Sequence, residues 1–224
     1  MAHGSNARLA EARTPGGRHL TLNREDGFLV MRIEGTLLMS NAVCYSEQRM
    51  VEVGCGGLGE RDGARVLVGG LGMGYCLRAV LDGVSATSRV VVAELLEAVV
   101  EWNRGPLADL AGRPLEDPRV QVEVADIADY LAAGPEPFDA ILLDTDNGPE
   151  ALTEPGNARL YEPMGLAQLH RCLRPRGTLV VWSSYQSPPF EKALRRAGFE
   201  ARSEMARSRG KKGVRHTLFV GRRR

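Results

Sequence analysis

The sequence predicts an α/β protein with a Rossmann-like sheet of parallel strands, and three observations predict it. The apolar run at residues 64–69 breaks into alternating glycines and then acquires helical spacing. A second apolar run, residues 89–93, ends on Glu94. Beyond it, strand-like and helix-like segments alternate, which is typical of parallel strands joined by crossover helices.

The glycine-rich loop after the first of these strands predicts a nucleoside site. Gly70, Gly72 and Gly74 have no Cβ, so the backbone can turn sharply and a ligand can lie against it. A dinucleotide loop has the spacing Gly-x-Gly-x-x-Gly and sets a helix amino end on a pyrophosphate, whereas this loop reads Gly-x-Gly-x-Gly. The spacing favours a ligand without phosphate, and the alternative is a turn that uses glycine only for its geometry.

Two further strand ends carry residues suited to a nucleoside. Glu94 stands where a carboxylate can accept hydrogen bonds from both ribose hydroxyls. After the third strand, Asp126 can accept from an adenine amine, while Ile127 covers a ring face and its amide donates to a ring nitrogen. The alternative for Asp126 is a cap on the helix at residues 127–132, and the two roles are compatible.

The fourth strand ends at Asp144, followed by Asp146 and Asn147. Three apolar residues precede Asp144, so we expect a desolvated carboxylate that accepts a proton from an attacking amine. Asp146 and Asn147 would orient that nitrogen, or else form an Asx turn that ends the strand.

Aromatic residues flank the expected site. Tyr161 begins a helix after the polar loop 150–160, which we expect to close over the site as a lid, and its alternative role is to pack on the sheet. Beyond the fifth strand, Tyr185 and Gln186 are candidates for contact with the substrate. We expect Trp182 to pack in the core.

The remaining elements follow from hydrophobic periodicity. Two or three short antiparallel strands are predicted over residues 19–39, and a helix from Tyr45 to Val53. The predicted parallel strands are 65–69, 89–93, 119–124, 139–143 and 177–182, and the helices lie near 74–82, 95–103, 127–132, 161–173 and 188–197. Strands near 199–205 and 214–221 would pair as a hairpin.

Five parallel strands and a terminal hairpin are typical of the class I S-adenosylmethionine-dependent methyltransferase-type sheet. In such sheets ligands lie outside the carboxyl ends of the strands, where the winding reverses. We expect disorder over residues 1–18, a short β-hairpin and helix region over 19–60, and a nucleoside-binding catalytic domain over 61–224.

Composition narrows the function. The 29 basic and 28 acidic residues leave a net charge of +1, so nothing favours nucleic acid as a partner. No stretch reaches eighteen apolar residues, and the four cysteines and four histidines lack metal-site spacing. We therefore expect a cytoplasmic protein with no membrane segment and no metal.

Several motifs together resemble one family. Residues 33–40, IEGTLLMS, look like its hairpin Leu-Asp-Gly-x-x-Gln-Leu-Thr; Tyr45-Ser46-Glu47 is similar to its Tyr-His-Glu; and residues 69–74, GGLGMG, are similar to its Gly-Gly-Gly-Asp-Gly-Gly. Further matches are Glu94, Asp126-Ile127, residues 138–144, Leu160-Tyr161 and residues 173–177. From about residue 19 to 221 the chain resembles a short, divergent member of the spermidine/spermine synthase family, the polyamine aminopropyltransferases.

The resemblance implies roles for individual residues. Glu94 would bind ribose, Asp126 would bind adenine, and Asp144 would deprotonate the attacking amine. Tyr161 is expected to be a catalytic residue, and Tyr45 and Glu47 are expected to bind the substrate. The expected donor is S-adenosylmethionine or its decarboxylated form, the partner is a small-molecule amine, and a homodimer is expected, with the edge of residues 19–39 as its first candidate surface.

Three departures from the family pattern bear on the reaction. The acid of the family's glycine loop, which pairs with the ammonium of the decarboxylated donor, is here Gly72; the family's histidine is Ser46; and the amino-terminal strand region is short. Without that acid, nothing repels the carboxylate of intact S-adenosylmethionine. The sequence thus predicts a transferase that alkylates an amine, with a small-molecule N-methyltransferase or a catalytically silent nucleoside-binding homologue as alternatives.

Overall fold

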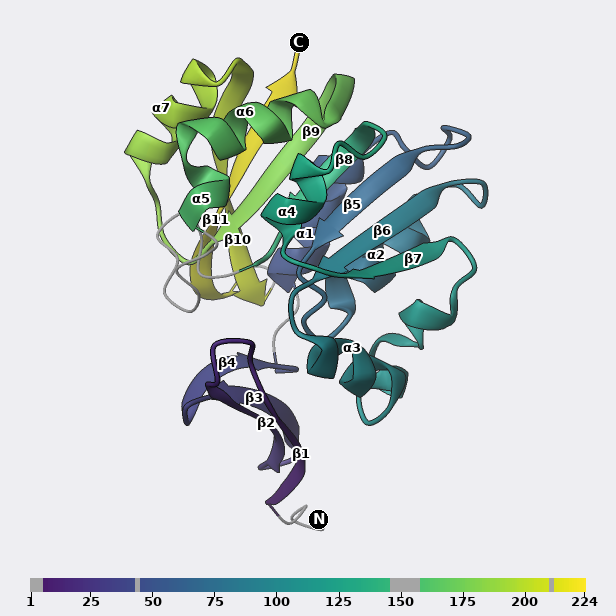
Figure 1. Ribbon diagram of the computed structural model, residues 1–224, viewed down its shortest axis with the longest axis vertical. Coiled ribbons are helices and arrows are strands. Elements are labelled where there is room, and N and C mark those ends of the chain that lie inside the picture. The colour runs from purple at the N-terminus through teal and green to yellow at the C-terminus, as the bar shows by residue number, and fades with distance from the viewer. Residues whose placement is uncertain (1–5, 43–44, 146–157, 210–211) are drawn as a thin grey trace.

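The computed structural model describes residues 6–42, 45–145, 158–209 and 212–224. Two sheets organise it (Figure 1). The smaller is antiparallel, in the order β1 (Ala7–Arg13), β2 (His19–Glu25), β3 (Phe28–Ile33) and β4 (Thr36–Ser40). The larger has seven strands in the order β10-β11-β9-β8-β5-β6-β7.

The strands of the larger sheet are β5 (Arg65–Gly69), β6 (Arg89–Glu94), β7 (Val120–Val124), β8 (Phe138–Leu143), β9 (Leu173–Ser183), β10 (Phe199–Arg209) and β11 (Lys212–Arg223). Strands β5 to β9 are parallel to one another, and β11 is antiparallel to both β9 and β10. The α-helices are α1 (Tyr45–Cys55), α2 (Tyr75–Gly83), α3 (Glu97–Arg104), α4 (Ile127–Ala132), α5 (Ala158–Tyr161), α6 (Pro163–Arg171) and α7 (Pro188–Arg196), with 3-10 turns η1 (Ala108–Ala111) and η2 (Pro114–Glu116).

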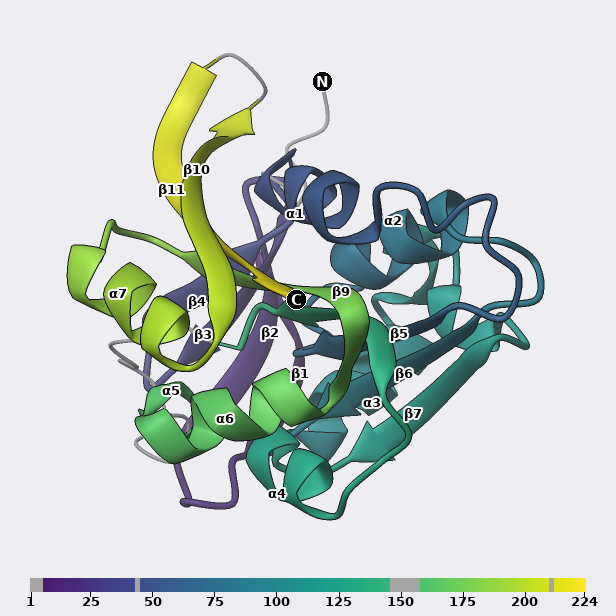
Figure 2. The ribbon, with the colours of Figure 1, turned by 90° about the horizontal axis from the view of Figure 1, so that it is seen from above.

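Helices cover both faces of the larger sheet (Figure 2). Alternate residues of β5 enter different cores: Val66 and Val68 pack with α1, α2 and α3, whereas Leu67 packs with α4, α6 and α7. In β8, Ala140 and Leu142 enter the first core and Ile141 and Leu143 the second. Because both faces of these strands are buried, they are continuous apolar runs in the sequence.

The smaller sheet packs onto the first core. Leu20 and Leu22 of β2 and Met31 and Ile33 of β3 are buried in the same cluster as the residues of α1, α2 and α3. The expected disorder of residues 1–18 is wrong for β1, which pairs with β2 along its length. Its apolar residues are mostly alanines, a weak signal, and its order comes from this pairing. Strand β1 also covers the β2 edge of residues 19–39, the region named above as the first candidate dimer surface.

Most predicted elements lie within a few residues of the observed ones, and the helix expected near 161–173 is α6, which begins at Pro163. The expectation that Tyr161 begins this helix is wrong, because Tyr161 is the last residue of the separate short helix α5. Proline has no N–H to continue a helix and favours a first helical position. Strand β9 then begins at Leu173, four residues before the predicted start at 177.

The winding reverses beside β5. From β5 the chain proceeds to β6 and β7 on one side, and then returns to β8 on the other. The carboxyl ends of these strands lead into Gly70, Glu94, Asp126 and Asp144. Within the described ranges, no helix combines the length and the apolar character needed to span a membrane.

The buried carboxylate of Asp139 in β8 offers a test of this packing. Its side chain is 1% exposed and pairs with Arg174 at 2.8 Å and Arg61 at 2.9 Å, and it accepts from the Arg65 amide at 2.8 Å. Because hydrogen bonds to a charged group are strong, Asp139→Asn should lower the free energy of unfolding by about 2 kcal/mol in urea denaturation. The control Glu136→Gln, in an ion pair whose carboxylate is 73% exposed, should change it by less than about 1 kcal/mol. Equal losses in the two variants would contradict this account.

Candidate functional site

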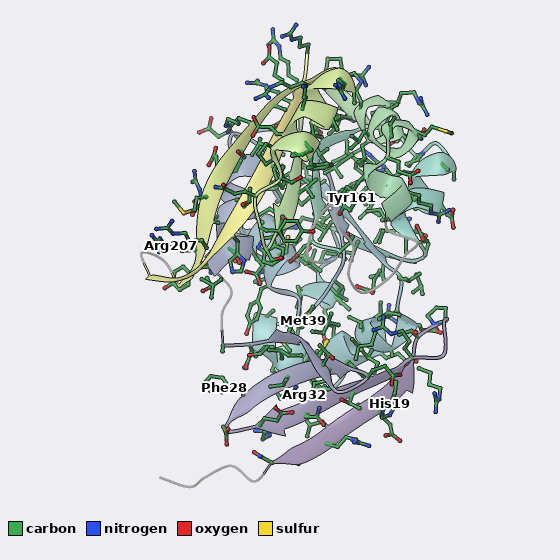
Figure 3. All side chains as sticks on the ribbon, turned by 90° about the vertical axis from the view of Figure 1, so that its left-hand side faces the viewer. His19, Phe28, Arg32, Met39, Tyr161 and Arg207 are labelled. Carbon is green, nitrogen blue, oxygen red and sulfur yellow. The ribbon has the colours of Figure 1, made fainter. Side chains whose placement is uncertain are left out.

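A cavity of about 520 Å³ lies at the reversal of winding. With the larger sheet taken as the base, the opposite way up from Figure 1, the lower wall of the cavity comes from the ends of β5, β6 and β8 and the start of α4. The roof comes from β3 and β4 of the smaller sheet. Figure 3 shows Met39 of β4 between the two sheets. The volume is within the usual range for small-molecule sites.

The glycine loop is held close to the strand end that carries Asp144. Gly70 has φ +88°, and a Cβ there would lie 2.4 Å from the Asp144 carbonyl oxygen. Gly72 has φ +53°, and its Cβ would lie 3.3 Å from both Sδ and Cε of Met39. Glycine at 70 is therefore required by the approach of two backbones, and glycine at 72 leaves the Met39 thioether beside the loop.

Glu94 is the central charged group of the loop region. Its Oε2 accepts from the Leu71 amide at 2.8 Å and its Oε1 from the Leu96 amide at 2.9 Å. Burial raises the pKa of this carboxyl, and the hydrogen bonds from backbone amides oppose that shift. Glu94 also lines the cavity, so its carboxylate is in reach of a ligand there.

Asp126 has two protein partners. Its Oδ1 accepts from the Ala128 amide at 2.8 Å, and its Oδ2 lies 2.9 Å from Nη2 of Arg159, which also contacts Asp129. The capping role predicted for Asp126 is confirmed. Its adenine role stays a prediction, and the contact with Arg159 was not predicted.

Two carboxylates from different elements line the cavity. Asp144 follows β8 and is fixed by its amide, which donates to the Gly69 carbonyl at 2.9 Å. Glu47 of α1 accepts from the Ser46 hydroxyl at 2.7 Å, and burial raises its pKa. Burial and then the negative charge of Asp144 raise the pKa of the Cys76 thiol, so the thiol stays protonated. Cys76 therefore lines the cavity as a neutral side chain.

Seven of the predicted site residues line the cavity, and they include residues predicted for catalysis, for the nucleoside and for the substrate. They are Glu47, Gly70, Gly72, Glu94, Asp126, Ile127 and Asp144. Five others do not line it: Tyr45, Gly74, Tyr161, Tyr185 and Gln186. Asp146 and Asn147 lie outside the described residues.

Each of the five has a different environment. Gly74 precedes α2 and faces Asn103 rather than the ligand space. Tyr45 is 53% exposed and Gln186 is exposed. The Tyr185 carbonyl accepts from the Ser183 hydroxyl at 2.9 Å in a turn after β9.

Tyr161 is buried behind the site. Its ring meets Phe190 edge-on, with centroids 5.6 Å apart, and its hydroxyl lies 3.0 Å from the hydroxyl of Thr145. Thr145 itself lines the cavity, next to Asp144. Tyr161 therefore contacts a residue of the cavity lining without lining the cavity itself.

The sequence analysis did not single out His216, and it expected Trp182 to pack in the core, where it does contact the first core. Trp182 of β9 and His216 of β11 both line the cavity, with ring centroids 4.6 Å apart and planes inclined by 33°. Leu218 is the cross-strand partner of Trp182, so His216, two residues earlier, lies on the same face. That juxtaposition depends on the register of β11 against β9, which the sequence does not show.

No metal centre is present in the part of the chain that the structure describes, where no three His, Cys, Asp or Glu side chains are grouped to hold an ion. The cavity instead combines a glycine loop, buried acids and an apolar roof.

Residues 44–197 match the model of the spermine/spermidine synthase domain, which is more than half of the chain. This chain belongs to the spermine/spermidine synthase family. It is 37% identical over 133 residues to the polyamine aminopropyltransferase of Mycobacterium tuberculosis strain H37Rv, covering 57% of this chain and 24% of that protein. It is 31% identical over 121 residues to the polyamine aminopropyltransferase of Korarchaeum cryptofilum, covering 53% of this chain and 35% of that protein. The matches thus span about a quarter to a third of these relatives.

Solved structures of the family share the fold. Spermidine synthase from Thermotoga maritima superposes with a TM-score of 0.73 at 15% identity, covering 97% of this chain and 73% of that one. A spermidine synthase in complex with the transition-state analogue AdoDATO gives a TM-score of 0.77 at 15% identity, covering 97% and 74%. The methyltransferase-type fold predicted from the sequence is confirmed.

The position of Glu94 predicts how nucleoside binding depends on pH. Ribose hydroxyls donate to the ionised carboxylate, so affinity for methylthioadenosine should fall as the pH drops through the raised pKa of Glu94. Because the folded-state pKa is raised, this group's contribution to stability is present at low pH and lost as pH rises, so its protonation does not unfold the protein. Glu94→Gln should weaken binding about tenfold or more at pH 8 and remove this pH dependence.

Titration calorimetry from about pH 4, close to the ordinary pKa of a glutamate, up to about pH 8 measures both effects. The exposed Glu97, which does not line the cavity, provides the control Glu97→Gln with wild-type behaviour. Equal affinities of wild type and Glu94→Gln across this range would refute the ribose role.

Proposed function

We propose that this chain transfers an alkyl group from the sulfonium of S-adenosylmethionine, or of its decarboxylated form, to the nitrogen of a small amine. The observation that carries the proposal is that Glu94 and Asp144 line one cavity beside the glycine loop, at the reversal of winding. Membership of the spermine/spermidine synthase family supports the same reaction class. So does the name of the relatives, polyamine aminopropyltransferases.

In this proposal the nucleoside is oriented by the lower wall of the cavity. Glu94 accepts hydrogen bonds from the ribose hydroxyls, and Gly70 lets the backbone pass close to the sugar. Asp126 accepts from the adenine amine, and Ile127 covers the ring. Arg159 and the Ala128 amide hold Asp126 in place for that contact.

Asp144 is the proposed general base. It takes a proton from the bound ammonium, which exposes the nitrogen lone pair. The nitrogen then attacks a carbon bonded to sulfur: the N–C bond forms, and the C–S bond breaks with its electron pair going to sulfur. The product nucleoside is a neutral thioether. The roof from β3 and β4 keeps water from the reacting atoms, and Glu47 attracts the amine.

Intact S-adenosylmethionine is favoured as an alternative donor by one specific contact. Gly72 brings no carboxylate to the loop, and the Met39 thioether fills the space beside it. A thioether carries no charge and so does not repel the donor's carboxylate. Methyl transfer to an amine is therefore the second candidate reaction.

The product nucleoside distinguishes these reactions. The purified protein is incubated with each donor and a panel of amines, and the nucleoside is identified by mass spectrometry. Methylthioadenosine identifies transfer of a three-carbon group, and S-adenosylhomocysteine identifies methyl transfer. Nucleoside binding without either product would contradict the proposal and favour a silent homologue.

Asp144→Asn removes the proposed base while keeping its shape. Turnover should fall at least about a hundredfold, since general base catalysis contributes that much, while affinity for methylthioadenosine stays near that of the wild type. Asp109, whose side chain is 85% exposed on η1, provides the matched control Asp109→Asn with normal turnover. Unchanged turnover in Asp144→Asn would exclude it as the base.

Gly72→Asp restores an acid to the glycine loop. At φ +53° aspartate is tolerated better than most residues. The ratio of kcat/KM for the decarboxylated over the intact donor should rise at least about tenfold, because the new carboxylate attracts one and repels the other. Gly72→Asn has nearly the same shape without the charge and should leave the ratio unchanged; an equal shift in both variants would show that charge is not the cause.

A further inference from the structure

Trp182 and His216 bring to the cavity two polar atoms that the proposed transfer does not use. Trp182 Nε1 and His216 Nδ1 are both shielded from solvent, and neither has a hydrogen-bond partner among the described residues. Buried polar atoms are nearly always paired, and each unpaired one costs about 1–3 kcal/mol. Both residues line the cavity, and a ligand group that displaces the side chains shielding these two nitrogens would supply the missing partners.

We propose that Trp182 and His216 recognise a hydroxyl group on the amine acceptor, so that the preferred substrate is an amino alcohol rather than an all-amine polyamine. This inference rests on the proposed alkyl transfer and adds the class of its acceptor. The residues matched to the family domain end at 197, so His216 lies outside that match.

The two nitrogens differ in what they offer. An indole Nε1 only donates, and therefore needs an acceptor atom. The imidazole Nδ1 accepts when the proton is on Nε2, and burial lowers the pKa of His216, which keeps the ring neutral. A hydroxyl both accepts and donates, so its two functions match this pair.

Other ligand groups match it less well. A protonated amine only donates, so it cannot pair with the indole N–H of Trp182. A carboxylate can accept from the indole, but Glu47 and Asp144 line the same cavity and repel a negative charge. These acids instead attract the ammonium at the other end of an amino alcohol.

Three probes with the same four-carbon chain isolate the terminal group: 4-amino-1-butanol, 1,4-diaminobutane and 4-aminobutanoate. Their affinities are measured by calorimetry on the free protein and on protein saturated with methylthioadenosine. The amino alcohol should bind at least about tenfold more tightly than either of the others, since a site built to hydrogen-bond a hydroxyl rejects analogues that lack it. Equal or tighter binding of the diamine, or no binding of any probe, would overturn the proposal.

Variants assign the preference to the ring pair. Trp182→Phe keeps an aromatic ring and removes the N–H, so it should abolish the preference for the amino alcohol and leave diamine binding unchanged. His216→Phe removes the acceptor and should have the same effect. Trp102→Phe makes the same change at a buried core position outside the cavity and should keep the preference. A preference that survives in both cavity variants would overturn the proposal.

The proposed alkyl transfer and the amino-alcohol preference are refuted by different results. If methylthioadenosine does not bind, or no donor gives a nucleoside product with any amine, the proposed alkyl transfer is wrong. If methylthioadenosine binds and the diamine is preferred, only the amino-alcohol inference is wrong.

Discussion

The carboxylate of Glu94, shared between the Leu71 and Leu96 amides, is the interaction on which the site depends. It joins the loop after β5 to the loop after β6, and it adds to the ladder between the two strands and to the hydrogen bond from the Gly70 amide to the Ala93 carbonyl. A neutral apolar residue there would leave two buried amides unpaired, at a cost of about 1–3 kcal/mol each. Burial disfavours the charge, as the raised pKa of the group indicates, and the backbone amides compensate for it. In the proposed function the same carboxylate also binds the ribose.

A second constraint is the smaller sheet. Met31 and Ile33 belong to the core that includes α1, α2 and α3, and they also line the cavity. The roof and the hydrophobic core are thus one packed unit. Because the roof is apolar and the lower wall carries carboxylates, the cavity suits a ligand with charged and apolar parts.

The sequence predicted the central part of the fold well for a physical reason. Strands β5, β6 and β8 are buried on both faces, so they are uninterrupted apolar runs, and the residues after their ends are glycine or acidic. The amino-terminal strand β1 could not be predicted in this way. Its alternating residues include few large apolar side chains, and its pairing with β2 is what orders it.

Apart from Glu47, which came from the family resemblance, the residues of the cavity were predicted where a residue's role follows from its place at or just after a strand end. Glu94, Asp126 and Asp144 meet that condition. Trp182 and His216 do not, because they come together through the register between β9 and β11. Tyr185 and Gln186 follow β9 in the sequence, but the turn after it directs them away from the cavity.

A crystal structure of the protein with methylthioadenosine tests the central claim most directly. The account predicts a nucleoside at the end of β5 and β6, with both ribose hydroxyls about 2.5–3.0 Å from the carboxylate oxygens of Glu94 and the adenine beside Asp126 and Ile127. A nucleoside bound elsewhere, or one whose ribose has no contact with Glu94, would contradict it.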